Sequence, residues 1–490
     1  MAAKKTTTPK MPVRIRMYRQ GLGDCFLLTL PGKGDKPFHM LIDCGVVLGS
    51  PGEQVDKLRS AVADVAAETK GELDLLIVTH EHWDHVSGFV QAETEFGGLR
   101  VKQTWLAWTE NPSDALATKL RKERRTAENA LRMAAQHLAM DGRVETAERV
   151  DSLVGFFGAK AGSTEDAMDR VKKIGAKKPR FCTPGEPPIV LDEVPGFRFF
   201  VMGPPKDEKL IKKSNPNKGD AYGLDAGTGG AQAFLVSALR RGMDAAAPMP
   251  GESTDDPFDA MFAIPMARAA QIPFFQDRYF GDSPDKGIYD RSEREAVKDQ
   301  SWRRIDAEWM DSTEAMALQL DAATNNTSLV LAIQMPDGEV LLFPGDAQAG
   351  SWLSWQDLAW EYDDEKTGRR VRLTGPDLLA RTVFYKVGHH GSHNATLRAK
   401  GLELMTNEAL TAMIPVDHDM AVKKRWGRMP LPELTDALTR HTRGRLLRVD
   451  DAERKPGELA KRRPKLCSAA EWAEFTDRVQ VTDLYFDLHF

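Results

Sequence analysis

The sequence predicts an α/β fold, and three observations carry this prediction. Short apolar segments, several of them ending in Gly, Pro or Asp, have the length and β-branched content of buried strands. Segments with apolar residues at helical spacing lie between them, for example over residues 52–70. Both patterns occupy residues 12–108 and return after residue 322, and strand patterns also occur at residues 189–191 and 197–202.

The first stretch contains several strand patterns and one clear helix. The strands are predicted at residues 13–18, 25–30, 38–45, 73–78 and 101–108. The helix over residues 52–70 has apolar side chains at Val55, Leu58, Val62 and Val65. Because the strands come with turns between them, we expect them to form one sheet.

Two segments interrupt this pattern. Residues 112–175 are rich in Ala, Leu, Lys, Arg and Glu, which predicts two to four helices. Residues 206–310 are rich in Gly, Pro and Asp, but aromatic residues such as Phe274 and Phe275 indicate a folded or covering segment rather than a free linker. A chain of 490 residues has room for two or three average domains or for one elaborated domain. We expect a disordered lead at residues 1–11 and one elaborated domain over residues 12–490, with a helical insertion at about 109–185 and an irregular one at about 206–320.

Composition narrows the class of protein. Hydrophobic residues make up 41% and charged residues 28% of the chain, the balance of a globular protein with a sizeable core. The net charge of −5 gives no overall attraction to nucleic acid or anionic membranes, so any such affinity must be local. Four cysteines without CxxC spacing predict free thiols in a reducing compartment. The sequence has neither a secretory signal nor a long apolar run, so we expect a cytoplasmic protein with no membrane segment.

The loop over residues 79–85 has the sequence THEHWDH and directly follows a predicted strand. It holds three of the eleven histidines in the chain, together with one aspartate. Imidazole and carboxylate are ligands of Zn²⁺, Mn²⁺ and Fe²⁺, and four of them on one loop can close on an ion with little backbone rearrangement. The alternative is a polar turn with surface histidines, which this concentration disfavours. The loop therefore predicts a metal site.

Two later strands end in residues of the same kind. Strand patterns resume at residues 328–333, 340–343, 382–387, 412–416 and 479–488, with helices expected at 351–361 and 432–441. Asp346 follows the second of these strands, and His389 and His390 follow the third. Polar groups at such strand ends meet in one crevice of a layered α/β fold. The expected metal ligands are His80, His82, Asp84, His85, Asp346 and His389. Five or six N and O ligands exceed the need of one tetrahedral ion, which favours two metals sharing a carboxylate, with Asp346 as the bridge.

Five short stretches, in this order along the chain, resemble those of a known family. They are QGLGD at residues 20–24, LIDCG at 41–45, the loop at 79–85, NNTSLVL at 325–331 with FPGD at 343–346, and KVGHHGS at 386–392. The loop resembles the signature of the metallo-β-lactamase fold, and the ordered set resembles the hydrolase domain of ComEC-type competence proteins. The resemblance implies an αββα sandwich, two mixed sheets flanked by helices, with the site at one edge. It covers residues 13–108, 186–205 and 322–450, so both insertions lie outside it.

The resemblance also assigns the ligands to two ions. It implies a first metal on His80 and His82, a second on Asp84, His85 and His389, and Asp346 between the two. Most of the superfamily has a further histidine at the first metal, and its place here is taken by Asn326, as a weak ligand or a substrate contact. Zinc is the usual ion of the superfamily, and manganese is the alternative.

Catalytic roles follow from this arrangement. Two cations lower the pKa of a water molecule and orient a hydrolytic displacement. Asp84 and Asp346 would orient that water, whereas His390 and Ser392 are candidates to contact a phosphoryl oxygen or to protonate the leaving group. Asp43 and Asp24 lie next to strand ends and are candidates to accept the second N–H of a ligand histidine; the alternative is an ordinary turn role.

The resemblance favours a phosphodiester substrate, hence a nuclease acting on DNA or RNA. Residues 421–465 contain fourteen Lys and Arg against six Asp and Glu, including Lys423, Lys424 and Arg425, and such a run can follow a phosphate backbone. A solvated surface is the alternative for these charges. Two other functions remain open: hydrolysis of a small molecule such as a cyclic nucleotide, lactone or other ester, and an effector whose insertions bind a protein partner that controls the site.

Overall fold

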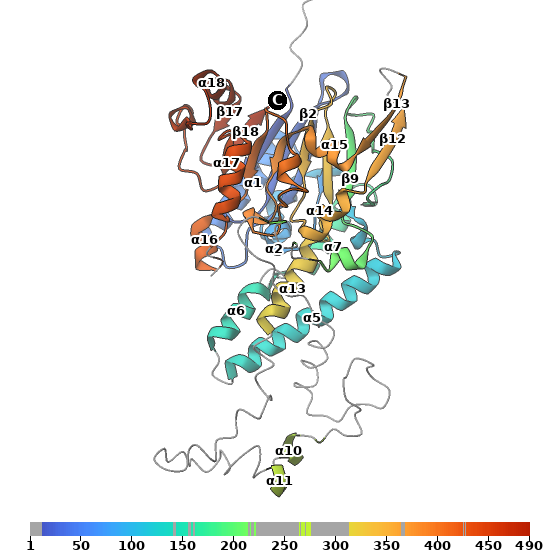
Figure 1. Ribbon diagram of the computed structural model, residues 1–490, viewed down its shortest axis with the longest axis vertical. Coiled ribbons are helices and arrows are strands. Elements are labelled where there is room, and N and C mark those ends of the chain that lie inside the picture. Colours follow the sequence, from blue (N-terminus) through green and yellow to red (C-terminus); the bar gives the residue numbers. More distant parts are fainter. Residues whose placement is uncertain are drawn as a thin grey trace, which may run out of the picture. The chain divides into compact units, whose positions relative to one another are not determined.

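The structure is a computed structural model, shown in Figure 1. It describes residues 12–140, 144–154, 158–159, 162–213, 216, 220–221, 264, 266–269, 271–275, 313–363, 368–424, 426 and 428–490. The lead at residues 1–11 and most of the predicted irregular insertion lie outside these residues. The chain divides into two compact units, the first made of Met1–Lys122, Gly155–Thr228 and Asp321–Phe490 and the second of Glu123–Val154 and Gly229–Leu320.

The first unit contains a mixed sheet of eight strands in the order β17-β18-β1-β2-β3-β4-β5-β8. Their bounds are β1 (Arg14–Tyr18), β2 (Cys25–Pro31), β3 (Pro37–Cys44), β4 (Glu72–Ile77), β5 (Arg100–Ala107), β8 (Arg180–Cys182), β17 (Val479–Val481) and β18 (Tyr485–His489). Strands β3, β4, β5 and β8 run parallel, and the other neighbours are antiparallel. The end of the chain therefore completes the sheet that its beginning starts.

A second mixed sheet has six strands in the order β16-β15-β14-β11-β10-β9. They are β9 (Arg198–Gly203), β10 (Val330–Gln334), β11 (Val340–Phe343), β14 (Thr382–Lys386), β15 (Thr411–Ile414) and β16 (Leu446–Arg448). Strands β11, β14, β15 and β16 run parallel, whereas β9, β10 and β11 are antiparallel. Two hairpins stand apart from both sheets: β6 (Gly158–Ala159) with β7 (Gly162–Ser163), and β12 (Ala359–Asp363) with β13 (Arg370–Thr374).

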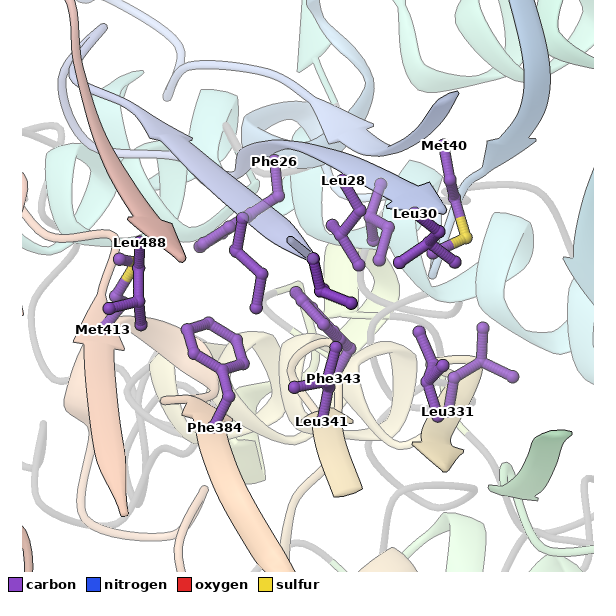
Figure 2. Close-up of a cluster of buried hydrophobic side chains, with 14 of the residues drawn as sticks. Phe26, Leu28, Leu30, Met40, Leu331, Leu341, Phe343, Phe384, Met413 and Leu488 are labelled. Carbon is purple, nitrogen blue, oxygen red and sulfur yellow. The ribbon is translucent and has the colours of Figure 1, made fainter. Parts of the chain in front are cut away.

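The two sheets share one apolar core. Figure 2 shows Phe26, Leu28 and Met40 of the eight-stranded sheet pointing toward Leu341 and Phe343 of the six-stranded sheet. The rings of Phe26 and Phe343 meet edge to face, with centroids 5.8 Å apart. Because side chains alternate along a strand, the opposite faces of both sheets are left for helices to cover.

Helices pack on these outer faces. The helices on the eight-stranded sheet are α1 (Gly52–Glu68), α2 (Trp83–Val86), α3 (Gly88–Gln91), α4 (Glu93–Phe96) and α7 (Thr164–Ile174). The helices on the six-stranded sheet are α14 (Ala349–Trp355), α15 (Gly375–Ala380), α16 (His418–Lys423) and α17 (Pro432–His441). The other described helices are α5 (Ala115–Met140), α6 (Val144–Val154), α8 (Glu208–Ile211), α10 (Met266–Ala269), α11 (Pro273–Phe275), α13 (Thr313–Asn325) and α18 (Ala469–Asp477). The predicted α/β class is confirmed, with mixed sheets and helices.

The second unit is helical where it is described. It holds α6, α10, α11, most of α5 and the beginning of α13. The predicted range of two to four helices in residues 112–175 agrees with α5, α6 and α7.

Three local predictions were wrong. The helix expected at 351–361 ends at Trp355, and residues 359–363 form β12 instead, because Trp360 pairs with Leu373 of β13 and packs edge to face on Phe200. The terminal pattern at 479–488 is two strands, β17 and β18, rather than one. Strand β8 lies inside the predicted helical insertion, where three residues are too few to give a period.

Burial of the cysteines and tryptophans agrees with a large core. All four cysteines are buried free thiols. Trp105, Trp108, Trp352 and Trp355 are at most 1% exposed, so these side chains are not available to stack on bases. No helix in the described part of the chain combines the length and the apolar content that a membrane crossing requires.

Candidate metal centre

Four strand ends bring their polar residues to one edge of the two sheets. Asp43 lies at the end of β3, and the loop that follows β4 begins with Thr79, whose amide donates to Asp43 Oδ1 at 2.7 Å. Asp346 follows β11 and His390 follows β14. His85 Nε2 lies 3.1 Å from Asp346 Oδ2, so residues from both sheets meet here.

The centre of this edge is a group formed by Asp84, His85, Asp346 and His390, whose ligand atoms all lie within 4.8 Å of one another. His390 Nε2 lies 2.7 Å from Asp84 Oδ2. All four side chains are at most 1% exposed. Imidazole nitrogens and carboxylate oxygens in such a group could hold a metal ion.

His80 and His82 lie next to this group and face one another. His80 Nε2 is 3.0 Å from His82 Nδ1. The Thr79 hydroxyl donates to Asp43 and so accepts from His80 Nδ1, which leaves a lone pair on His80 Nε2. Burial lowers the pKa of both imidazoles well below the usual range, so they are neutral, which is the form that binds metals.

The structure gives the two adjacent histidines different neighbours. His390, which was expected to contact the substrate, lies in the central group, whereas His389, an expected ligand, does not. Nδ1 of His389 faces Ser392 Oγ at 2.8 Å, and its Nε2 faces Asn325 Nδ2 at 3.5 Å. Both histidines have left-handed backbone angles, with φ of 44° and 52°, and this unusual turn decides which side chain faces the carboxylates.

The two asparagines at the end of α13 have different partners. The side-chain nitrogen of Asn326 donates to two backbone carbonyls, those of Ile211 and Lys213. Its Oδ1 accepts from the amide of Gln348. The preceding residue, Asn325, contacts His389 and Asp321. The side chain of Asn326 therefore links backbone groups from two segments of the chain.

Two carboxylates support the central histidine. Asp43 Oδ2 accepts from His85 Nδ1 at 2.8 Å, which leaves His85 Nε2 turned toward Asp346. Asp24 Oδ2 lies 3.7 Å from the same Nδ1 and forms an ion pair of 2.5 Å with Lys386 Nζ. The contact with Asp43 is of the kind that fixes the tautomer and orientation of a ligand histidine.

Lys386 was missed by the sequence analysis. Its ammonium group, 1% exposed, also donates to Asp346 Oδ1 at 2.9 Å and to the carbonyl of Gly345. Together with the amide of His389, it occupies Oδ1 of Asp346 and leaves Oδ2 facing the histidines. A charged residue at the end of an otherwise apolar strand pattern was the available signal.

Asp321 and Asn325 were also missed, and they lie four residues apart on one face of α13. Asn325 Nδ2 donates to Asp321 Oδ2 at 3.2 Å. Burial, with Asp84 and Asp346 nearby, raises the pKa of Asp321 well above its usual range. The spacing of a carboxylate and an amide at one helical turn was the signal in the sequence.

The buried carboxylates raise the pKa of the neighbouring imidazoles, and the imidazoles lower the pKa of Asp84. Burial alone would lower the pKa of His85, but the surrounding carboxylates, Asp346 and Asp24 above all, outweigh it and raise that pKa well above the usual range. The pKa of His390 is raised for the same reason, chiefly by its hydrogen bond to Asp84. Burial raises the pKa of Asp84 less than His85 and His390 lower it, so that it falls to about 2.

Several buried acceptors at this edge are well suited to a cation. Among the described residues, no hydrogen-bond donor contacts Oδ1 of Asp84 or Oδ1 of Asn325. These side chains are at most 1% exposed, and leaving a buried acceptor unpaired is costly. The donor set of nitrogen and oxygen atoms therefore fits a divalent metal.

The basic run gives no added support to a nucleic-acid surface. Lys423 is exposed at the end of α16, whereas Lys424 is half-buried, and burial lowers its pKa. Arg425 lies outside the described residues.

Comparison with known proteins does not place the chain in a family. No protein-family model, no curated protein and no solved structure matches the chain.

Proposed function

We propose that the protein is a metal-dependent hydrolase of the metallo-β-lactamase fold that cleaves phosphodiesters, as a nuclease on DNA or RNA. The observation that carries this proposal is the buried group of Asp84, His85, Asp346 and His390 at the shared edge of two mixed sheets. A core between the sheets and helices on their outer faces are compatible with an αββα sandwich.

The residues divide between two ion positions in this proposal. His80 and His82 would hold the first ion, Asp84, His85 and His390 would hold the second, and Asp346 would contribute its carboxylate to both. Zinc is the first choice for these ligands, and manganese is the second. Divalent ions bound there would act as Lewis acids and lower the pKa of a water molecule.

The protein residues position the ligands and hold protons. Asp43 fixes the tautomer of His85, and Lys386 neutralises part of the charge of Asp24 and Asp346. Exclusion of water from this edge strengthens each of these interactions.

The roles first expected for His390 and Ser392 change in this arrangement. His390 spans Asp84 and the carbonyl of Pro415, so it serves as a ligand rather than as a proton donor to substrate. Ser392 Oγ contacts Asn394 Oδ1 at 3.0 Å and His389 Nδ1 at 2.8 Å, so its hydroxyl is engaged within the protein. Burial lowers the pKa of His389 to about 4. We assign no proton donor for the leaving group.

A small substrate is the second candidate. The four residues of the central group are at most 1% exposed, and such burial suits a small phosphodiester or other ester better than a duplex.

One incubation series separates the two candidates. Purified protein with Zn²⁺ or Mn²⁺ is given single- and double-stranded DNA, RNA and a small chromogenic phosphodiester. Asp84→Ala is the test variant, and Asp169→Ala, which removes an exposed carboxylate of α7, is the matched control. Polymer cleavage that is lost only in Asp84→Ala supports the nuclease. Cleavage of the small ester alone supports the second candidate, and no metal-dependent cleavage of any substrate contradicts both.

A further inference from the structure

Asp321 is a buried carboxylate that faces one of the expected metal ligands. It lies on α13 and is 5% exposed. Its Oδ2 accepts from Asn325, whereas its Oδ1 lies 3.7 Å from Nε2 of His82. Among the described residues, no hydrogen-bond donor contacts this Oδ1. One oxygen of Asp321 is thus held in place, and the other is turned toward the imidazole.

The two nitrogens of His82 face different partners. Nδ1 faces His80 at 3.0 Å, and Nε2, on the far side of the ring, faces Asp321. If Nδ1 binds an ion together with His80, the ring proton of His82 must be on Nε2. Asp321 is placed to accept this proton and is not placed to share the ion with His80.

The other histidines of the site already show this pattern. The Nδ1–H of His85 donates to Asp43 Oδ2, and the Nδ1–H of His390 donates to the carbonyl of Pro415. His80 donates to Thr79. A ligand histidine commonly passes its remaining N–H to a carboxylate or carbonyl, which fixes the ring and makes the ligand nitrogen more basic. Asp321 is the corresponding residue for His82.

We propose that Asp321 is a positioning residue for His82: its carboxylate accepts the Nε2–H, keeps the lone pair on Nδ1 and tightens binding at the first ion position. The proposal rests on the proposed function in one respect, that the site binds metal. A separation of 3.7 Å exceeds hydrogen-bond length, so we expect the two groups to approach when an ion is bound.

The test uses Co²⁺ as the probe, because it gives both an affinity and a spectrum. The full chain and the variants Asp321→Asn, Asp321→Glu and Asp43→Asn are titrated with Co²⁺ against a chelator. We expect Asp321→Asn to weaken one of two binding steps by about 10- to 100-fold and Asp43→Asn to weaken the other, the size usual for such partners. Asp321→Glu retains the carboxylate and restores part of the loss.

A second readout separates positioning from a structural role. In the cobalt-loaded protein, ring N–H protons of ligand histidines give strongly shifted, exchangeable NMR signals. The Nε2–H signal of His82, assigned by its loss in His82→Ala, exchanges faster with solvent in Asp321→Asn than in the unsubstituted protein. Circular dichroism checks that each variant folds, and if Asp321→Asn does not, the same comparison is made with Asp321→Ala, which also removes the carboxylate.

The outcomes distinguish this proposal from the proposed function. Unchanged cobalt affinity and an unchanged N–H signal in a folded Asp321→Asn protein overturn the role of Asp321, while metal-dependent hydrolysis by the unsubstituted protein still supports the function. Equal losses in Asp321→Asn and Asp321→Glu without a change in the N–H signal also overturn it, because they indicate packing alone. If the unsubstituted protein binds no cobalt, both proposals fail.

Discussion

Similar charged residues surround the two ends of β3, but they are paired at the surface at one end and buried at the other. Its first half borders a cavity of about 730 Å³ lined by lysines, acidic residues and His39, while its last residues lead to the candidate metal centre. At the cavity the charges pair with one another at the surface, as in the 2.7 Å contact of Lys102 with Asp74. At the metal centre the same residue types are buried, and Asp84 keeps an acceptor atom without a donor among the described residues.

This difference shows which property marks the site. A histidine with carboxylates and lysines nearby is present at both ends, so composition does not separate them. Surface ion pairs contribute little to stability, because both partners are also solvated by water. Buried acceptors that lack donors favour the binding of a cation. Substitutions beside the metal centre should therefore have larger effects than similar substitutions beside the cavity.

The largest expected effect is that of Lys386→Met. The substitution removes the ammonium group that pairs with both Asp24 and Asp346 and leaves these two buried carboxylates with His85 as their cationic neighbour. We expect a loss of about 3–5 kcal/mol in the free energy of unfolding, the size seen when one partner of a buried ion pair is removed. Urea unfolding of the chelator-treated protein measures it, and a variant as stable as the unsubstituted protein would contradict the role given to Lys386.

His390→Ala is expected to have the next largest effect. It removes an imidazole from the central group, so we expect metal affinity and hydrolysis to fall by more than about 100-fold, beyond the range for groups that only support a ligand. His39→Ala, at the other end of β3, is the matched control and leaves both unchanged. Metal content and hydrolysis are measured for both, with His389→Ala beside them. A larger loss in His389→Ala than in His390→Ala would restore the assignment made from sequence.

The pH dependence of metal uptake is the third prediction. The raised pKa values of His85 and His390 mean that each imidazolium persists to higher pH than that of an ordinary histidine, and an ion must displace the proton from the ligand nitrogen. Affinity therefore rises with pH above the ordinary histidine value, by about tenfold per pH unit for each proton displaced, and levels off once pH passes the raised values. His80 and His82, with lowered pKa values, contribute no protons in this range.

Calorimetry in buffers of different ionisation heats counts the protons released. Release of one or two protons per bound ion near neutral pH agrees with the prediction. An affinity that does not change between about pH 6 and 8 would show that His85 and His390 are neutral before the ion binds.

The strand ends were predictable from sequence because they are local features. An apolar run that stops at Asp, Thr-His or Gly-Asp needs no long-range information, and Asp43, His80 and Asp346 were all placed at strand ends in this way. The α/β class followed from the same runs. The αββα sandwich came only from the resemblance and stays a proposal.

The direction in which a side chain points within a loop or a helical turn was not predictable from sequence. Which of His389 and His390 faces the carboxylates depends on two left-handed residues in succession, which L-amino acids rarely adopt. Which of Asn325 and Asn326 faces the site depends on where α13 ends. Contacts such as that of Lys386 with Asp24 join residues far apart in the chain, so no local pattern contains them.

The smallest expected effect is that of Lys102→Met, the counterpart of Lys386→Met at the other end of β3. Lys102 is 45% exposed and pairs with Asp74 and Glu72, where water screens the interaction. We expect a change of less than about 1 kcal/mol in the free energy of unfolding and no change in metal affinity. The measurements are those used for Lys386→Met. A loss of stability as large as that of Lys386→Met would mean that burial does not distinguish the metal centre from the cavity. Buried acceptors without donors would then not identify the metal centre.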